Sequence, residues 1–193
     1  MKLIIASNNA HKIHEIKQIL SGKFDEILSL SEAGIDHETV EDGATFAENA
    51  YKKAREIAEI TGCAALADDS GLCVSALGGA PGVISARYAG GGVVHSTDAE
   101  NNALLLKNLE GVSDRRAYFI CAVALVYPDG RLVSAEGYMH GSIIDTPRGG
   151  KGFGYDPLFL PVGENRTVAE LSDEEKNAIS HRGNALKNLL SLI

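Results

Sequence analysis

Short apolar runs alternate along the chain with amphipathic segments, and this alternation restricts the possible folds more than any other feature. The run Leu3–Ala6 is typical of a buried strand, and the segment 11–20 that follows it carries isoleucines at helical spacing. Around Pro128-Asp129-Gly130, two longer strand-like runs predict a hairpin. The expected strands are 3–6, 26–30, 63–67, 117–127 and 131–140, and the expected helices are 11–20, 45–60, 99–109 and two pieces after Ser172 and Ser180. This order predicts an α/β or α+β domain with a mixed sheet.

Length and composition are those of an ordinary globular protein. The 193 residues predict a single domain, 1–193, with a sizeable core, and 45% apolar and 23% charged residues are typical values. A net charge of −8 argues against nucleic acid as a partner, although local cations or a bound metal can still attract a small anion. Three cysteines without C-x-x-C spacing, and a first apolar run too short for a signal or a span, predict a reduced, cytoplasmic protein with no membrane partner.

The segment Gly149–Pro157 combines four glycines within six residues with charged and aromatic side chains. Glycine permits positive φ and lets a ligand approach the backbone closely. Lys151, Phe153, Tyr155 and Asp156 add an ammonium, two rings and a carboxylate, as a nucleotide site would require. A turn between strands with both rings in the core explains the segment equally well. It matches neither the P-loop nor the dinucleotide fingerprint.

Two lysines are candidates for binding an anion. One lies in the loop between the first strand and the first helix, which comprises Ser7, Asn8, Asn9, Ala10, His11 and Lys12. Amides at a helix N-terminus bind anions, so this loop is either a phosphate site or a polar loop with a solvated lysine. The other is Lys53, seven residues after Phe46 on the inward face of helix 45–60. Lys53 either extends to the edge or points at an anion in a cleft.

Acidic residues gather where the expected strand 63–67 ends. Asp68 and Asp69 follow the strand directly, and Glu41 precedes the long helix. Carboxylates suit Mg²⁺, which takes one or two of them together with substrate phosphates. Because adjacent residues of a strand face opposite sides, we expect only one of the two aspartates to serve such a site. A turn capped by an aspartate is the alternative.

The last helix is expected to open with Ser180-His181-Arg182, and Lys176 lies just upstream. Arg182 can only donate hydrogen bonds, so it suits a base with carbonyl oxygens better than one with an amino group. The alternative is a solvated positive patch on a helix end.

Taken together and in order, these segments resemble the inosine triphosphate pyrophosphatase family, whose members cleave ITP, dITP and XTP. Asn8 departs from the glycine that many relatives carry, which would leave the loop stiffer. The matching segments are Ser7–Lys12, Glu48–Ala50, Ala67–Gly71, Gly78–Gly82, Ser85–Tyr88, Gly150–Pro157 and Ser180–Arg182.

The resemblance implies an α/β fold with a long curved mixed sheet, flanking helices and two lobes around a cleft. It also implies a homodimer and dependence on Mg²⁺. Water would attack the α-phosphorus of a purine nucleoside triphosphate and release the monophosphate and pyrophosphate, keeping deaminated purines out of DNA and RNA. The resemblance implies by position that Ser7 to Lys12 and Lys53 contact the triphosphate and that Ser70 lies beside the phosphates. It implies that Glu41 and Asp69 are metal ligands and that Asp69 is also the general base. The residues that it implies for the base and sugar pocket are Phe153, Gly154, Tyr155, Asp156, Lys176, His181 and Arg182.

Two other functions stay open at this point. One is a Maf-like pyrophosphatase that acts on other modified nucleotides. The other is a non-catalytic nucleotide-binding module, which would not need Glu41, Asp68 and Asp69. The sequence does not rank ITP, dITP and XTP as substrates.

Overall fold

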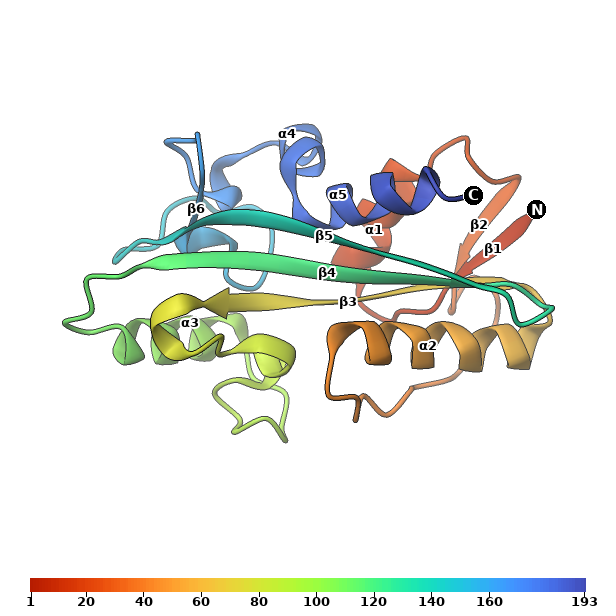
Figure 1. The fold of residues 1–193 in the computed structure, drawn as a ribbon, viewed down its shortest axis with the longest axis horizontal. Helices are drawn as coiled ribbons and strands as arrows, with labels where there is room; N and C mark the ends of the chain where they lie inside the picture. The colour runs from red at the N-terminus through yellow and green to blue at the C-terminus, as the bar shows by residue number, and fades with distance from the viewer. The chain divides into compact units, whose positions relative to one another are not determined.

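The structure is a computed structural model that describes residues 1–193, and it contains one six-stranded sheet (Figure 1). Along the sheet the strands follow the order β2-β1-β3-β4-β5-β6. The strands are β1 (Lys2–Ile5), β2 (Glu26–Ser29), β3 (Ala64–Val74), β4 (Arg116–Val126), β5 (Leu132–Ile143) and β6 (Phe159–Pro161). The helices are α1 (Ala10–Ile19), α2 (Phe46–Thr61), α3 (Asp98–Asn108), α4 (Asp173–Ile179) and α5 (His181–Leu190). β1 pairs in parallel with β2 and β3, whereas β5 and β6 are antiparallel, so the predicted mixed sheet is confirmed.

The chain forms two compact units. Unit 1 comprises Met1–Asp69, Cys121–Gly137 and His181–Ile193, and unit 2 comprises Ser70–Ile120 and Tyr138–Ser180. Strands β3, β4 and β5 contribute residues to both units. No helix combines the length and the apolar character that crossing a membrane requires.

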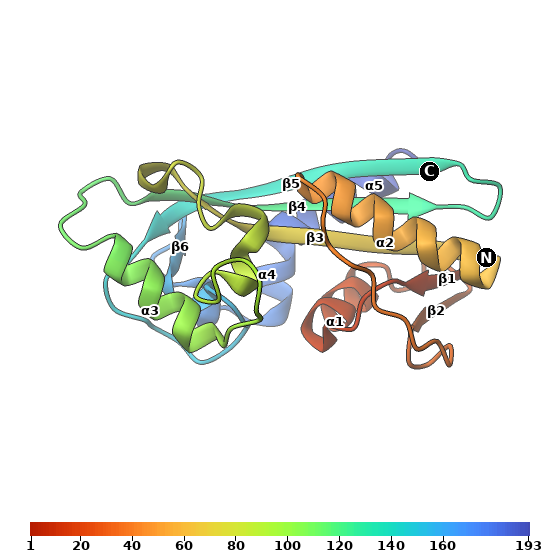
Figure 2. The same ribbon diagram turned by 90° about the horizontal axis from the view of Figure 1, so that it is seen from below.

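In unit 1, helices cover both faces of the sheet. Helix α2 lies on one face, and α1 and α5 lie on the other (Figures 1 and 2). Leu3 and Ile5 of β1 belong to the core cluster that includes Leu186 of α5, whereas Ile4 belongs to the cluster that includes Ala54 of α2. Because β1 is buried on both faces, its sequence is an unbroken apolar run rather than an alternating one.

The predicted start of α2 is confirmed. Thr45 accepts a hydrogen bond from the Glu48 amide, and the Glu48 side chain accepts one from the Thr45 amide, which forms a capping box. The helix ends at Gly62, whose φ of 63° is left-handed. Its inward face carries alanines and Ile57, together with two polar residues, Asn49 and Lys53. The helix therefore delivers both core packing and polar groups to the same side of the sheet.

The end of β3 differs from the prediction. The strand does not stop before Asp68 but continues as Ala64–Val74, so the acidic pair lies inside a buried strand and not at its end. The residues Leu72, Cys73 and Val74 supply the apolar side chains that extend the strand. Two charges can remain inside it because both aspartates have partners, as buried charges require.

Unit 2 has a core of its own. Leu72, Leu105, Phe119 and Phe159 pack together there, and the rings of Phe119 and Phe159 lie 4.6 Å apart. Helix α3 begins after Thr97, which forms a capping box with Glu100, as one of the two predicted caps. All three cysteines of the chain are free thiols, and Cys73 and Cys121 are buried, as expected.

Candidate active site

The two adjacent aspartates of β3 face opposite sides of the sheet, as strand geometry predicts. Asp69 Oδ2 accepts a hydrogen bond of 3.0 Å from Asn49 Nδ2 of α2. Asp68 Oδ2 accepts bonds of 3.1 and 2.9 Å from Nε and Nη2 of Arg182, which belongs to α5. The two carboxylates therefore belong to different surroundings within unit 1.

The Asp69 face forms the first cluster. Lys53 Nζ lies 2.6 Å from Glu41 Oε1 and 3.9 Å from Asp69 Oδ1, so both carboxylates reach one ammonium. Asn49 links the cluster to the chain before α2, because its Oδ1 accepts a 2.8 Å bond from the Gly43 amide. The Lys53 side chain is only 11% exposed, which shows that it points inward and not to the helix edge.

Burial and neighbouring charges together shift the pKa values of Asp69 and Lys53 in this cluster. It raises the pKa of Asp69 above the ordinary aspartate value, although Lys53 and Lys12 oppose the shift. Burial by itself would lower the pKa of Lys53, but the charges of Asp69 and Glu41 outweigh it, so that the pKa is raised. Lys53 is therefore a stable cation beside a carboxylate whose affinity for a proton is increased.

The Asp68 face forms the second cluster. Arg182 is fully buried, pairs with Asp68, and also donates from Nη1 to Glu15 Oε2. Lys12 Nζ lies 3.2 Å from Asp68 Oδ2. Burial favours the protonated form of Asp68, yet Lys12, Arg182 and Lys53 together hold its pKa well below the usual range. Asp68 thus stays ionised and acts as the shared counter-ion of two cations.

In the loop before α1, a side chain caps the helix, and the phosphate role of the loop stays a prediction. Asn9 caps the helix, and its Oδ1 accepts bonds of 3.0 and 3.1 Å from the amides of His11 and Lys12. Two amides that could bind an anion are therefore bonded to a side chain. Lys12 is not the solvated lysine of the alternative interpretation, because its side chain is 14% exposed and reaches Asp68.

In unit 2, the glycine-rich loop brings Phe153, Asp156 and Lys176 together. Asp156 Oδ2 accepts bonds from Lys176 Nζ at 2.7 Å and from the Phe153 amide at 3.0 Å. The same ammonium lies 4.7 Å from the centre of the Phe153 ring. Tyr155 instead packs in the core and donates a 2.7 Å bond from its hydroxyl to the Ser85 carbonyl. One ring of this loop thus has the core role of the alternative interpretation, whereas the other lies beside a cation.

The predicted site residues divide between the units. Unit 1 brings Glu41, Lys53 and Asp69 into one cluster, and Lys12 and Arg182 into the other. The remaining predicted residues of unit 1 are Ser7, Asn8, Asn9, Ala10, His11 and the buried His181, and those of unit 2 are Ser70, Phe153, Gly154, Tyr155, Asp156 and Lys176.

Two polar residues that contact these clusters were not among the predicted site residues. Asn49 lies in the middle of the apolar stripe of α2, where a buried amide needs a partner, and this position is a signal that the sequence offers. Glu15 precedes Ile16 on α1 and is buried against Arg182. Its helical position carries no comparable signal, because its partner lies at the other end of the chain.

The carboxylates also decide how a metal would be held. The structure has no group of three or more His, Cys, Asp or Glu side chains placed to hold a metal ion. The pair Glu41 and Asp69 nevertheless fits a hard divalent cation such as Mg²⁺, which commonly takes one or two protein carboxylates and completes its shell with water and phosphate oxygens.

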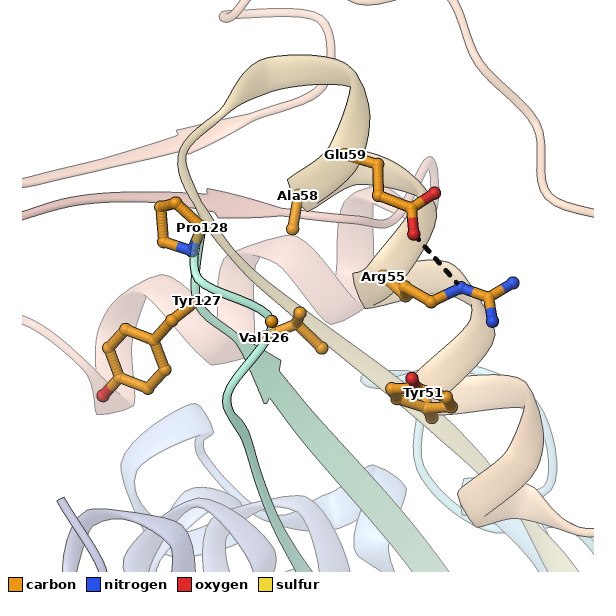
Figure 3. A pocket seen from close by; sticks show the side chains of 8 residues that line it. Tyr51, Arg55, Ala58, Glu59, Val126, Tyr127 and Pro128 are labelled. Atoms are coloured by element: carbon orange, nitrogen blue, oxygen red, sulfur yellow. Dashed lines mark ion pairs between the residues drawn. The ribbon is translucent and has the colours of Figure 1, made fainter.

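A shallow hollow of about 190 Å³ lies elsewhere in unit 1, against α2 and the turn between β4 and β5 (Figure 3). In its lining, the Arg55 guanidinium carbon lies 5.5 Å from the centre of the Tyr51 ring, and Arg55 Nε lies 3.7 Å from Glu59 Oε1. The hollow contains none of the predicted site residues, so the clusters on β3 remain the candidate active site. Its lining consists of Tyr51, Arg55, Ala58, Glu59, Val126, Tyr127, Pro128 and Gly130.

The fold is that of an α/β protein with a mixed sheet, in which lysines of α1 and α2 lie beside buried carboxylates of β3. Comparison with known families makes the assignment specific. The model of the Ham1 family matches residues 3–192, and the chain belongs to this family. The family resemblance drawn from the motifs is therefore confirmed.

Relatives and solved structures match this chain over nearly its whole length. A dITP/XTP pyrophosphatase of Clostridium perfringens (strain 13 / Type A) is 50% identical over 196 residues, which cover 97% of this chain and 95% of the relative. One from Geobacter sulfurreducens is 51% identical over 187 residues, covering 96% and 92%. The structure of a HAM1 protein from Coxiella burnetii, 43% identical, superposes with a TM-score of 0.88 over 100% of this chain and 98% of that one.

Proposed function

We propose that this chain hydrolyses deaminated purine nucleoside triphosphates, namely ITP, dITP and XTP, to the nucleoside monophosphate and pyrophosphate. The observation that carries the proposal is the cluster of Asp69, Glu41 and Lys53, which combines a proton acceptor, a second carboxylate and a cation. The similarity to dITP/XTP pyrophosphatases supports the substrate class. Removal of such nucleotides would keep deaminated bases out of DNA and RNA.

In this proposal Asp69 is the general base. It takes a proton from a water molecule whose oxygen attacks the α-phosphorus, while the bond from that phosphorus to the bridging oxygen breaks and pyrophosphate leaves. Its raised pKa makes it a better proton acceptor than an ordinary surface aspartate. Asn49 Nδ2 donates a hydrogen bond to Asp69 Oδ2 and thereby orients the carboxylate.

Cations of the chain and a metal share the charge of the triphosphate. Lys53 and Lys12 contact triphosphate oxygens, and Glu41 with Asp69 would hold Mg²⁺. When bound, Mg²⁺ would neutralise phosphate charge as the leaving group forms. The pairing of Lys53 with Glu41, and of Lys12 with Asp68, holds both ammonium groups in place before a ligand arrives.

Recognition of the base in this proposal follows the family resemblance. In unit 2, the Phe153 ring offers a face for stacking, and Lys176 beside it offers a donor to a 6-oxo group. A contact between Arg182 and the base stays a prediction from the family resemblance. Because the Tyr155 side chain is engaged in the core, we infer that its backbone makes any contact with substrate.

Product analysis tests the function. With ITP and Mg²⁺, the purified protein should form IMP and pyrophosphate in equal amounts, resolved by ion-exchange chromatography. IDP and orthophosphate as main products would contradict the proposed reaction. Faster turnover of other modified nucleotides in a panel would favour a Maf-like activity, and tight binding of ITP without turnover would favour a non-catalytic module.

A further inference from the structure

Helix α3 reaches the glycine-rich loop through two side chains that lie one helical turn apart. Asp98 Oδ2 accepts a 2.6 Å bond from the Gly154 amide, and Asn102 Nδ2 donates a 3.0 Å bond to the Gly154 carbonyl. Residues four apart share one face of a helix, so a single face of α3 holds both polar groups of one loop residue.

We propose that Asp98 and Asn102 are positioning residues that fix the backbone of Gly154 and, through it, the Phe153 ring and the Asp156 carboxylate for base binding. What the loop binds rests on the proposed function, whereas the way α3 holds the loop does not.

Gly154 is a point where the loop would otherwise be free to move. Its φ of 63° lies in the left-handed region, which glycine adopts readily and at the largest loss of conformational freedom. A Cβ built on it would meet no atom within 4 Å, so side-chain packing does not hold it. The hydrogen bonds from Asp98 and Asn102 of α3 therefore determine how the Gly154 peptide is oriented.

The neighbours of Gly154 pass this orientation on. On one side, the Phe153 amide donates to Asp156 Oδ2, which also binds Lys176 beneath the Phe153 ring. On the other side, the Tyr155 hydroxyl is anchored to the Ser85 carbonyl. With Tyr155 anchored, a rotation at Gly154 is taken up at Phe153, so the ring and its partner Asp156 lose their alignment.

The two α3 side chains are not explained by the needs of the helix itself. The capping box of Thr97 and Glu100 already satisfies the start of α3, which leaves the Asp98 carboxylate available to the loop. The Asn102 Oδ1 atom is buried without a hydrogen-bond partner, a state that costs free energy. The hydrogen bond that this side chain makes is the one from Nδ2 to the Gly154 carbonyl.

Variants at both positions test the proposal by two independent measurements. Amide-proton exchange at Gly154, followed by NMR, reports how firmly the loop is held, and steady-state kinetics with ITP report base binding. We expect Asp98→Ala to speed exchange and to raise KM, each about 10-fold, as loss of a charge-assisted bond implies, while kcat stays close to the wild-type value. Asn102→Ala should act in the same direction with a smaller effect.

Two further variants separate positioning from stability. Asp98→Asn keeps an acceptor oxygen for the Gly154 amide, so its KM should lie close to the wild-type value. Lys107→Ala changes an exposed residue of the same helix and should leave exchange and kinetics unchanged. Unchanged exchange or unchanged KM in both alanine variants would overturn the proposal, as would a uniform loss of kcat that follows a fall in melting temperature. If the wild-type protein fails to cleave ITP, the proposed function fails, and exchange at Gly154 still reports whether α3 holds the loop.

Discussion

On β3, the carboxylates of Asp68 and Asp69 leave the strand on opposite faces and meet different partners. Asp69 meets Asn49 and Lys53, and its pKa is raised, chiefly by burial. Asp68 meets Arg182 and Lys12, and these cations hold its pKa low. At the scale of single residues, one aspartate is suited to accept a proton and the other to hold cations in place.

This contrast predicts different consequences for the same substitution. Asp69→Asn keeps the shape but removes a proton acceptor and a charge, so kcat with ITP should fall at least ~10²-fold while the melting temperature changes little. Asp68→Asn should instead decrease the free energy of unfolding, and the decrease should approach the roughly 3–5 kcal/mol that is lost when a buried ion pair loses one partner. Urea denaturation and initial rates distinguish them. Normal turnover by Asp69→Asn, together with a stable but inactive Asp68→Asn, would mean that the roles are reversed.

Arg182 carries the prediction on selectivity. Its guanidinium has no acceptor for the 6-amino group of adenine, whereas the 6-oxo group of hypoxanthine can accept from it. Arg182→Ala should therefore lower kcat/KM with ITP more than with ATP. Because Arg182 is buried against Asp68 and Glu15, the variant is assayed at a temperature where circular dichroism shows it to be folded. Equal proportional losses on both substrates would show that Arg182 acts only as an ion-pair partner.

At the scale of elements, β5 and α5 approach each other closely at Gly137. A Cβ at this position would lie 2.1 Å from the Ala185 amide nitrogen and 2.3 Å from the His181 carbonyl oxygen, both in the backbone of α5. Backbone atoms cannot move aside as a flexible side chain can, so only glycine allows this packing. The close contact also determines where α5 places His181 and Arg182 within unit 1.

Gly137→Ala should consequently destabilise the protein by at least the ~1–3 kcal/mol typical of overpacking, and ITP hydrolysis should fall with it because α5 is displaced. Gly150→Ala is the matched control for stability, since a Cβ there meets nothing within 4 Å and its φ is not left-handed. Urea denaturation of the two variants makes the comparison. Equal stability of both would show that α5 adjusts without cost.

At the scale of the whole molecule, the carboxylates of the candidate site have cationic partners within the chain itself. Lys53 reaches both Glu41 and Asp69, so removal of a divalent cation leaves no cluster of unpaired carboxylates. The net charge of −8 repels an anionic substrate, and the cations of the site offset this repulsion locally. The homodimer implied by the family resemblance stays a prediction.

Metal removal should therefore separate activity from stability. EDTA should abolish ITP hydrolysis, and added Mg²⁺ should restore it, because the triphosphate charge needs a cation during transfer. The melting temperature should be nearly the same with and without Mg²⁺. Full activity in EDTA would contradict a metal-assisted reaction, and a large fall in melting temperature would assign the cation a structural role instead.

Sequence alone determined the elements whose signals are local. Thr45 and Glu48 predict the start of α2, the turn 128–130 predicts the hairpin of β4 and β5, and the ordered motifs identify the family. Alternation along β3 also predicts that Asp68 and Asp69 face opposite sides. These features depend on backbone periodicity and on caps within a few residues, which a single segment contains.

Only the tertiary structure decided which charges could be buried. Arg182 bonds to Asp68, 114 positions away, and to Glu15, 167 positions away. Burying an arginine without these partners costs too much free energy, so the local sequence around Arg182 indicates either a solvated patch or a ligand contact. For the same reason, the local sequence predicts that β3 ends where its charged residues begin. In the structure, these residues of α1, α5 and β3 form ion pairs with one another. Strand β3 continues through Asp68 and Asp69 because long-range ion pairs offset the cost of desolvating their charges, and such pairs are not visible in a local segment of the sequence.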